Sequence, residues 1–298
     1  MRCSKLMATI IVLIISASIT LAQWATAPGA VAEQNDFGLV NYSNREIIAT
    51  GIGAVPANAP NVGAARANAI RAARVDALRN LVEAVKAVRV TSETTVNNNM
   101  VENDIVRTKV EAMVRGAQQV GEVKYLSDAS VEVTMAVPMS GIMDVVLPTT
   151  ASATLLPAGE MTSTTETPAA GVPAESAPAA PAIAGQPVTG LIIDARGLGV
   201  KPSMSPRVFA DDGAVLYGPG KYPRDFAVTQ GVVGYHKDIE AARDDARVAG
   251  NPLTIKGVRT SGTLATDVVI SMSDAQLAAG YDGFAEAIGN CRVMFILD

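Results

Sequence analysis

Residues 149–187 are the feature that most constrains how this chain can fold. The segment is rich in Thr, Ala, Ser and Pro, and it has almost no large apolar side chain after Leu156. Such a composition cannot bury enough surface to offset the entropy that is lost on ordering. We therefore expect a disordered Pro/Ala/Thr-rich linker at 149–187, joining one domain at 41–148 to a second at 188–298.

The first 32 residues have the three-part layout of a secretory signal peptide. Arg2 and Lys5 precede an apolar run, and small residues follow it. Two cleavage positions suit a signal peptidase, after Ala32 and after Ala22, and the first is preferred. The alternative is an uncleaved membrane anchor at 6–22, but its apolar core of roughly 10 to 17 residues falls short of the ~20 that a bilayer needs.

The two cysteines limit both lipid attachment and disulfide bonding. Cys3 precedes the apolar run, so it is not the lipid-modified cysteine that follows such a run in a lipoprotein. Removal of the leader leaves Cys291 alone, without an internal disulfide partner. Because Cys291 begins an apolar segment, we expect it to be a buried core residue of a strand at 291–297.

The first domain shows an alternation of strand and helix patterns. Residues 63–88 lack Pro, are rich in Ala and carry apolar residues at spacings of three and four, which predicts a long helix. Its other face is basic, and such a face is either solvated or contacts an anionic partner. A second helix ending near Gly116 is also expected. Strands are predicted at 45–55, 90–96, 117–126 and 130–137.

The second domain begins with a buried strand at 189–196. Asp211, Asp212 and Gly213 supply a tight hairpin turn between strands at 207–210 and 214–218. Further strands are expected at 253–258, 267–271 and 291–297, with helices at 238–248 and 273–288. The fold class is therefore α+β, with two small domains that each carry a mostly antiparallel or mixed sheet with helices packed on it.

The sequence offers few residues for chemistry. His236 is the single histidine, and no Gly-x-Ser-x-Gly, Gly-x-Gly-x-x-Gly or Gly-Lys-Ser/Thr motif is present. Asp194, Asp211 and Asp212 could be imagined as an acid/base pair or a cation site, although aspartates at strand ends and turns commonly make only local hydrogen bonds. We expect no catalytic, cofactor-binding or metal-binding residue, and no cofactor.

Three segments of the first domain carry a resemblance to a known family. Ile48-Ala-Thr-Gly-Ile-Gly-Ala-Val-Pro56, the Ala-rich helix 67–88 and Val90-Thr-Ser-Glu-Thr-Thr-Val96 resemble the LPP-type envelope lipoprotein family and the related N-terminal domain of flagellar assembly protein T. The second domain, with Thr189-Gly-Leu-Ile-Ile-Asp-Ala-Arg-Gly-Leu198, resembles C-terminal domains attached to such domains in uncharacterised exported bacterial proteins. The resemblance implies a non-enzymatic envelope or flagellar-ring component that acts through protein contacts.

These observations favour an exported periplasmic protein, peripheral to the outer membrane, that serves as a structural or assembly factor of the cell envelope. Flagellar basal-body ring assembly is the narrower expectation. Envelope or flagellar basal-body proteins are the expected partners, and homo-oligomerisation is left open.

Nucleic acid is not expected as a partner, because the formal net charge is -5 and aromatic residues make up only 4% of the chain. The first places to look for an interface are the helix 63–88 and the strand Leu191–Asp194. The alternative is an envelope-polymer-binding module or hydrolase that uses the second-domain aspartates.

Overall fold

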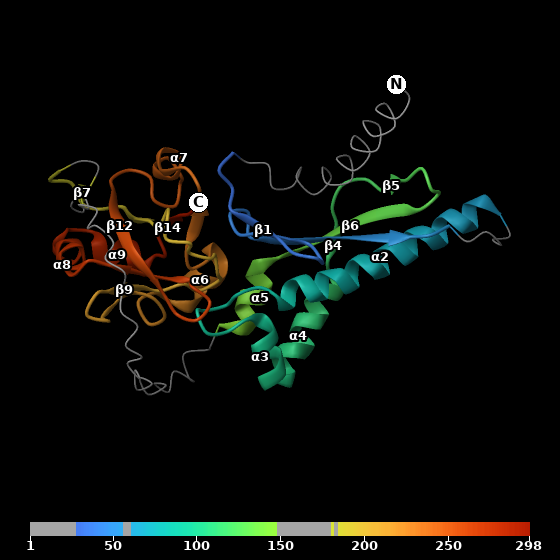
Figure 1. Cartoon of the computed structure of the whole chain (residues 1–298), viewed down its shortest axis with the longest axis horizontal. Coiled ribbons are helices and arrows are strands. Elements are labelled where there is room, and N and C mark those ends of the chain that lie inside the picture. Colours follow the sequence, from blue (N-terminus) through green and yellow to red (C-terminus); the bar gives the residue numbers. More distant parts are fainter. Residues whose placement is uncertain (1–27, 56–60, 148–179, 182–183) are drawn as a thin grey trace, which may run out of the picture.

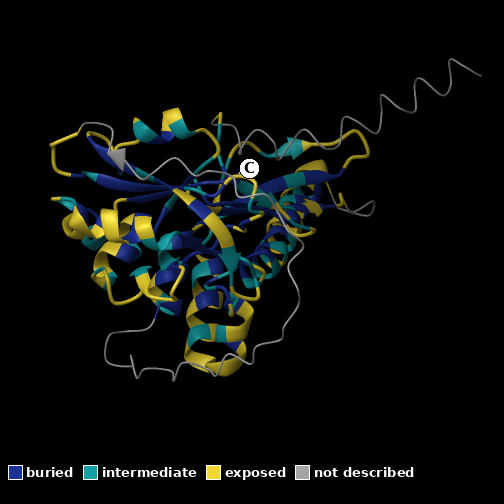
Figure 2. Ribbon diagram, turned by 60° about the vertical axis from the view of Figure 1, so that its left-hand side comes forward, coloured by how far each residue is buried: buried dark blue, intermediate teal, exposed yellow. Residues whose placement is uncertain are grey.

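The computed structural model describes residues 28–55, 61–147, 180–181 and 184–298, and in it the two domains lie side by side (Figure 1). The predicted leader up to residue 27 and most of the predicted linker lie outside the described residues. One apolar cluster contains residues of both domains, so the domains share a continuous core. Figure 2 shows the buried residues gathered in the interior of the molecule, with many exposed residues at its periphery.

The first domain is built on a six-stranded antiparallel sheet in the order β1-β2-β3-β6-β4, with β5 also pairing with β6. The strands are β1 (Ala32–Gln34), β2 (Leu39–Asn41), β3 (Glu46–Gly53), β4 (Gln118–Gln119), β5 (Lys124–Tyr125) and β6 (Val131–Pro138). The sequence predicts β3 and β6 well. The predicted strand at 117–126 is instead two short strands.

The helix α2 (Val62–Lys86) lies along one face of this sheet, as the sequence predicts. Its buried face consists largely of small residues, namely Ala65, Ala69, Ala73, Ala77, Leu81, Ala84 and Val85. The facing strand β3 carries Gly51, where a Cβ would lie 2.1 Å from the backbone nitrogen of Ala77. The absence of a side chain at this position lets the helix backbone approach the sheet directly.

Two helices, α3 (Val96–Glu102) and α4 (Asp104–Arg115), project from the first domain on the side of α2 away from the sheet (Figure 1). The sequence predicts a strand at 90–96, and this prediction is wrong: residues 90–95 form a loop and α3 begins at Val96. Thr95 and Asn98 form a capping box that starts α3 in an Asn-rich stretch. The helix α5 (Met139–Val146) closes the domain.

The second domain is built on a mixed eight-stranded sheet in the order β10-β9-β13-β12-β8-β14-β11, with β7 also pairing with β12. The strands are β7 (Ala180–Pro181), β8 (Gly190–Asp194), β9 (Val208–Ala210), β10 (Val215–Tyr217), β11 (Gly234–His236), β12 (Pro252–Ser261), β13 (Asp267–Ile270) and β14 (Val293–Ile296). The predicted hairpin turn is present, with Gly213 at a φ of 86°. The central strand β8 is buried on both faces, since Leu191 joins the large core and Ile192 a smaller cluster on the opposite face.

Four helices belong to the second domain: α6 (Arg224–Gln230), α7 (Ile239–Arg243), α8 (Met272–Gly280) and α9 (Phe284–Gly289). The single helix predicted at 273–288 is interrupted, because Gly283 adopts a left-handed conformation ahead of α9. Ser271 caps α8 by accepting from the Asp274 N–H, so the helix begins one residue before the predicted start. With helices packed on antiparallel and mixed sheets in two domains, the predicted α+β class is confirmed.

Both predicted domain boundaries require correction. The first domain does not begin at 41: Val31 is 5% exposed, its carbonyl accepts from Tyr42 N–H at 3.0 Å, and Ala32 starts β1. The linker does not extend to 187, because β7 pairs with β12 and the Asn251 side chain donates to the Gln186 carbonyl at 3.0 Å. The predicted extent of the linker rests on amino-acid composition, from which these backbone contacts cannot be predicted.

Candidate functional site at the domain junction

The loop between α2 and α3, residues 87–95, carries much of the contact between the domains, and we call it the junction loop. Its carbonyls at Arg89, Val90 and Ser92 accept from the backbone N–H groups of Met204, Ser205 and Leu264, at 2.9, 2.8 and 2.8 Å. The strand pattern of this segment is therefore not used in a sheet. The segment uses its backbone groups to bind second-domain loops instead of a sheet.

A buried ion pair lies beneath the junction loop. The Asp267 carboxylate accepts from Arg207 Nε at 2.9 Å and from the Ser92 hydroxyl at 2.6 Å, and both Asp267 and Ser92 are fully buried. Arg207 Nη2 also contacts Glu93 Oε1 at 2.7 Å. Burial alone would lower the pKa of Arg207, but the carboxylates of Asp267 and Glu93 outweigh burial and raise it. The guanidinium therefore stays charged and holds the loop to the second domain.

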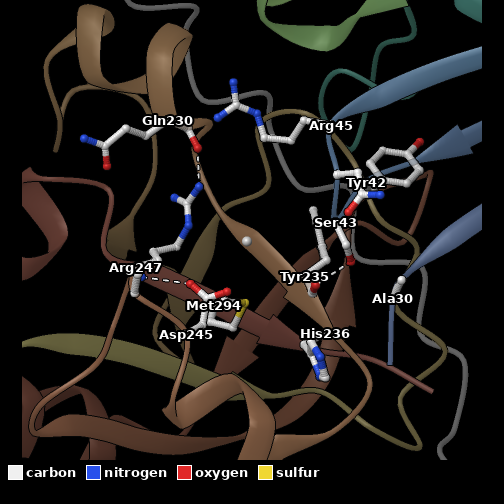
Figure 3. A pocket seen from close by; sticks show the side chains of 13 residues that line it. Ala30, Tyr42, Ser43, Arg45, Gln230, Tyr235, His236, Asp245, Arg247 and Met294 are labelled. Carbon is white, nitrogen blue, oxygen red and sulfur yellow. Dashed lines mark hydrogen bonds between the residues drawn. The ribbon is translucent and has the colours of Figure 1, made fainter. Parts of the chain in front are cut away.

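An aromatic contact forms the second part of the junction. The rings of Tyr42 and Tyr235 meet edge to face with centroids 5.8 Å apart, and Tyr235 meets Phe295 at 5.9 Å. Ser43 Oγ donates to the Tyr235 carbonyl at 2.6 Å (Figure 3). At the same edge, the Gly29 carbonyl accepts from Lys237 N–H at 2.8 Å.

A cleft of about 550 Å³ opens beside this aromatic contact, with one wall from each domain (Figure 3). The first domain supplies Ala30 and the turn at residues 42–45. The second domain supplies β11 with its preceding residues, the segment 245–247 and Met294. We call it the interdomain cleft.

Two arginines from different domains face this cleft. Arg247 donates to the carbonyls of Cys291 at 2.8 Å and Gly231 at 3.1 Å, and also to that of Gln230. Arg45 donates to the Val228 carbonyl at 3.4 Å from a turn position with a φ of 58°. Burial and then the charge of Arg247 lower the pKa of Arg45, and burial lowers that of Arg247. Within the described part of the chain, no carboxylate makes an ion pair with either arginine.

The three aspartates singled out in the sequence are not brought together. Asp194 pairs with Arg196 at 2.7 Å, and hydrogen bonds from Arg196 lower its pKa. Asp211 pairs with Arg259 at 3.4 Å, whereas Asp212 accepts from Ala214 N–H within the hairpin at 2.9 Å. The strands β12 and β13 separate β8 from β9, so Asp194 and Asp211 do not stand on neighbouring strands. Their hydrogen bonds are the local ones expected of strand-end and turn aspartates.

His236 and Cys291 both lie near the interdomain cleft, in structural settings. His236 Nδ1 accepts from Asp238 N–H at 2.9 Å, and a Cβ on Gly29 would lie 2.3 Å from its ring. Cys291 is fully buried, as expected, and burial raises its pKa. It stands at a φ of 54° just before β14, not within the strand.

Part of the basic face of α2 is occupied within the first domain. Arg74 donates to Gln119 Oε1 at 2.9 Å, Arg66 lies over the ring of Tyr125 at 5.2 Å, and Lys86 pairs with Glu83 at 2.7 Å. These contacts join α2 to β4 and β5 or stay within the helix. The other predicted interface, Leu191–Asp194, lies in the buried strand β8.

Neither Arg45 nor Arg247 stands in a motif, and sequence analysis missed both. Arg45 belongs to a polar turn, Asn41-Tyr-Ser-Asn-Arg45, and Arg247 to a mixed acidic and basic stretch. Only the packing of the domains brings the two side chains to one cleft.

The described residues contain no group of three or more His, Cys, Asp or Glu side chains that could hold a metal ion. Across those same residues, no helix has the length and apolar character required to traverse a bilayer.

Two family models match the chain, one in each domain. Residues 53–136 match the model of the LPP20 lipoprotein, and residues 190–298 match that of the second domain of Treponema pallidum Tp0624. Comparison with curated proteins gives no match. The two matches support a two-domain, lipoprotein-like chain and confirm the lipoprotein part of the resemblance. The resemblance to flagellar assembly protein T stays a prediction.

Proposed function

We propose that this chain is an exported, envelope-associated protein that acts without catalysis, as a structural or assembly factor that binds another envelope protein. The LPP20 lipoprotein match at 53–136 and the leader-like first 32 residues support the location. No cysteine stands directly after the apolar run of the leader, which supports peripheral association in the periplasm instead of a covalent lipid anchor.

The observation that carries the proposal is the exposed apolar tip of the α3–α4 hairpin. Val101 is 68% exposed and Ile105 is 66% exposed, on either side of the turn at Asn103. The hairpin is anchored at its other end, where Val110 and Val114 of α4 are buried. Both exposed residues lie within the segment that matches the LPP20 model.

A projecting, anchored hairpin with aliphatic side chains at its tip is suited to docking in an apolar groove of a partner. Glu102 and Asp104 lie between the two apolar residues, in the turn of the hairpin, and are themselves exposed. The expected partner surface is therefore an apolar groove with basic residues close to the point where this turn docks.

Site-specific photocrosslinking in cells tests this docking. A photoreactive residue at Val101 is expected to capture one defined envelope protein, and the same residue at Leu277 on α8, which is 47% exposed, serves as the control. The double variant V101D/I105D is expected to lose the complex while keeping the wild-type melting temperature, since both positions face solvent. Equal labelling from positions 101 and 277 would contradict the proposal.

The flagellar role is the narrower form of the proposal. It requires that a deletion strain lose motility or assemble altered basal-body rings. Normal motility with normal rings would remove the flagellar role and leave the envelope role standing.

Absence of catalysis is tested on purified cell-wall fragments. We expect no turnover by the wild-type protein and no effect of alanine at Asp194, Asp211 or Asp212. Turnover that disappears in one of these variants would establish the hydrolase alternative instead.

A further inference from the structure

We propose that the interdomain cleft binds a small molecule through a phosphate or carboxylate group, held between Arg45 of the first domain and Arg247 of the second. This ligand site is independent of the docking proposed for the α3–α4 hairpin, which lies elsewhere on the first domain. Either proposal can fail without the other.

Three neighbouring arginines at the junction pair with carboxylates, whereas Arg45 and Arg247 do not among the described residues. Arg207 and Arg224 pair with Asp267 and Asp144 at 2.7 and 2.9 Å, and Arg89 pairs with Glu33. No ion pair is found for Arg45 or Arg247 among the described residues. Asp245 accepts from the backbone N–H of Arg247 at 2.8 Å and attracts its charge, yet it forms no ion pair with the guanidinium.

Two partly buried cations without a carboxylate partner repel each other, and an anion between them would remove that repulsion. Guanidinium groups recognise phosphate and carboxylate oxygens through paired, charge-assisted hydrogen bonds. A phosphate or carboxylate is therefore the chemistry that completes this cleft.

The guanidinium of Arg247 is fixed before any ligand arrives. Its Nη atoms donate to three backbone carbonyls, those of Gln230, Gly231 and Cys291. Its Nε lies beside Gly234, where a Cβ would come within 3.1 Å of that nitrogen. Glycine at 234 thus lets the side chains of Arg247 and Met294 pack closely against the backbone of β11.

Arg45 is held in a conformation that arginine seldom adopts. Its φ of 58° is in the left-handed region. Most residues lose free energy of folding in this conformation, whereas Gly and Asn tolerate it. In this conformation the side chain reaches across the junction and packs against Gly231, where a Cβ would lie 3.3 Å from Arg45 Cδ. The turn alone would be better served by asparagine, so the arginine side chain is the feature to explain.

The space and its lining suit a small polar molecule. The interdomain cleft has about 550 Å³, and a second hollow of about 410 Å³ adjoins the other side of Arg247 and includes Arg292 and Asn290. Ser43, Asn44 and Gln230 line the first hollow as uncharged polar groups. A volume of this order holds a small metabolite or a lipid headgroup.

Calorimetric titration with inorganic phosphate and with citrate, at low ionic strength, tests the site on the full mature chain. Wild-type protein is expected to bind at least one of these probes, and binding raises the melting temperature because only the folded state binds. Failure of both probes to bind at millimolar concentration overturns the proposal.

The key variant is Arg45→Asn, with Arg259→Asn as the matched surface control. The Arg45→Asn variant is expected to bind the probe at least tenfold more weakly while its ligand-free melting temperature stays equal or rises, because asparagine tolerates the left-handed turn. Arg45→Lys keeps the positive charge but loses the paired hydrogen bonds of the guanidinium, and it is expected to bind more weakly than wild type and more tightly than Arg45→Asn. If Arg45→Asn lowers the melting temperature and leaves probe binding unchanged, Arg45 is only a structural contact and the proposal is wrong.

Two further arms distinguish the sources of the oxyanion once binding is established. Soluble glycerol 3-phosphate competes with the probe if the natural ligand is a free metabolite or a headgroup. Cosedimentation with phosphatidylglycerol vesicles that depends on Arg45 assigns the site to lipid headgroups, and binding of the soluble compound without cosedimentation assigns it to a free ligand.

Discussion

At the scale of single residues, Asp267 decides how strongly the junction loop is attached. Its carboxylate is fully buried and binds both Arg207 and the hydroxyl of Ser92. Asp267→Ala leaves the Arg207 guanidinium without its buried partner, which we expect to cost about 3–5 kcal/mol in the free energy of unfolding. Urea unfolding measures this.

The exposed pair between Arg259 and Asp211 provides the matched control. Asp211→Ala is expected to change the unfolding free energy by less than about 1 kcal/mol, because water screens the pair. Equal effects of the two substitutions would show that the buried ion pair does not stabilise the junction.

The ionisation of Glu93 makes the stability of the junction depend on pH. Burial by itself raises the pKa of Glu93, but its contact with the Ser92 hydroxyl, whose single proton Asp267 shares, and the charge of Arg207 reverse this, so the pKa lies below its ordinary value of 4.5. A carboxylate with a lowered pKa stabilises the fold above its ordinary pKa, and that stabilisation is lost as pH falls through the lowered value. Melting temperature measured from pH 6 to pH 3 should therefore fall less steeply below pH 4.5 in Glu93→Gln than in wild type. Parallel curves would exclude this contribution.

At the scale of elements, the close approach of α2 to β3 depends on glycine. A Cβ on Gly51 would lie 2.1 Å from Ala77 N and 2.3 Å from the Ala73 carbonyl oxygen, both backbone atoms that cannot move aside. Gly51→Ala is expected to destabilise the protein by about 3 kcal/mol or more, the upper end for overpacking. Thermal unfolding measures the change.

Gly280 at the end of α8 is the control for this substitution, since a Cβ there would meet nothing within 4 Å. Gly280→Ala is expected to be neutral or to stabilise by up to about 1 kcal/mol. Similar losses of stability at Gly51 and Gly280 would mean that the helix–sheet contact does not determine the effect.

The strand β1 bears on where a leader could be removed. Cleavage after Ala32 would take away buried Val31, whose N–H donates to Ser43 Oγ at 2.9 Å, and the first residue of β1. We therefore expect cleavage after Ala22, with Gln23 as the first residue of the exported protein. Intact mass measures this, and a mass that begins at Glu33 would contradict it.

Elements with strong local patterns were predictable from the sequence, and those made by tertiary contacts were not. The Ala-rich period of α2 and the alternation of β6 determine their structures, and Gly213 determines its turn. The segment 90–96 has an equally clear strand pattern, but its backbone partners are loops of the other domain. Arg45 and Arg247 have no local signature, because their juxtaposition exists only once the domains are packed.

At the scale of the whole molecule, the shared core predicts that both domains unfold together. Tyr42 of the first domain packs on Tyr235 of the second, and the junction loop binds the second domain through its backbone. Scanning calorimetry is expected to give one endotherm with equal calorimetric and van't Hoff enthalpies. Two resolved transitions would show that the domains are energetically independent.

The bond from Ser43 to the Tyr235 carbonyl joins residues 192 positions apart. A ribosome has completed about four-fifths of the chain before Tyr235 exists, so Tyr42 and Ser43 spend most of synthesis without the second-domain residue that they contact. Pairings of such long sequence separation form slowly. The surface that Tyr42 buries against Tyr235 is thus exposed for most of translation. A chaperone that covers this surface would reduce aggregation of the unfinished chain.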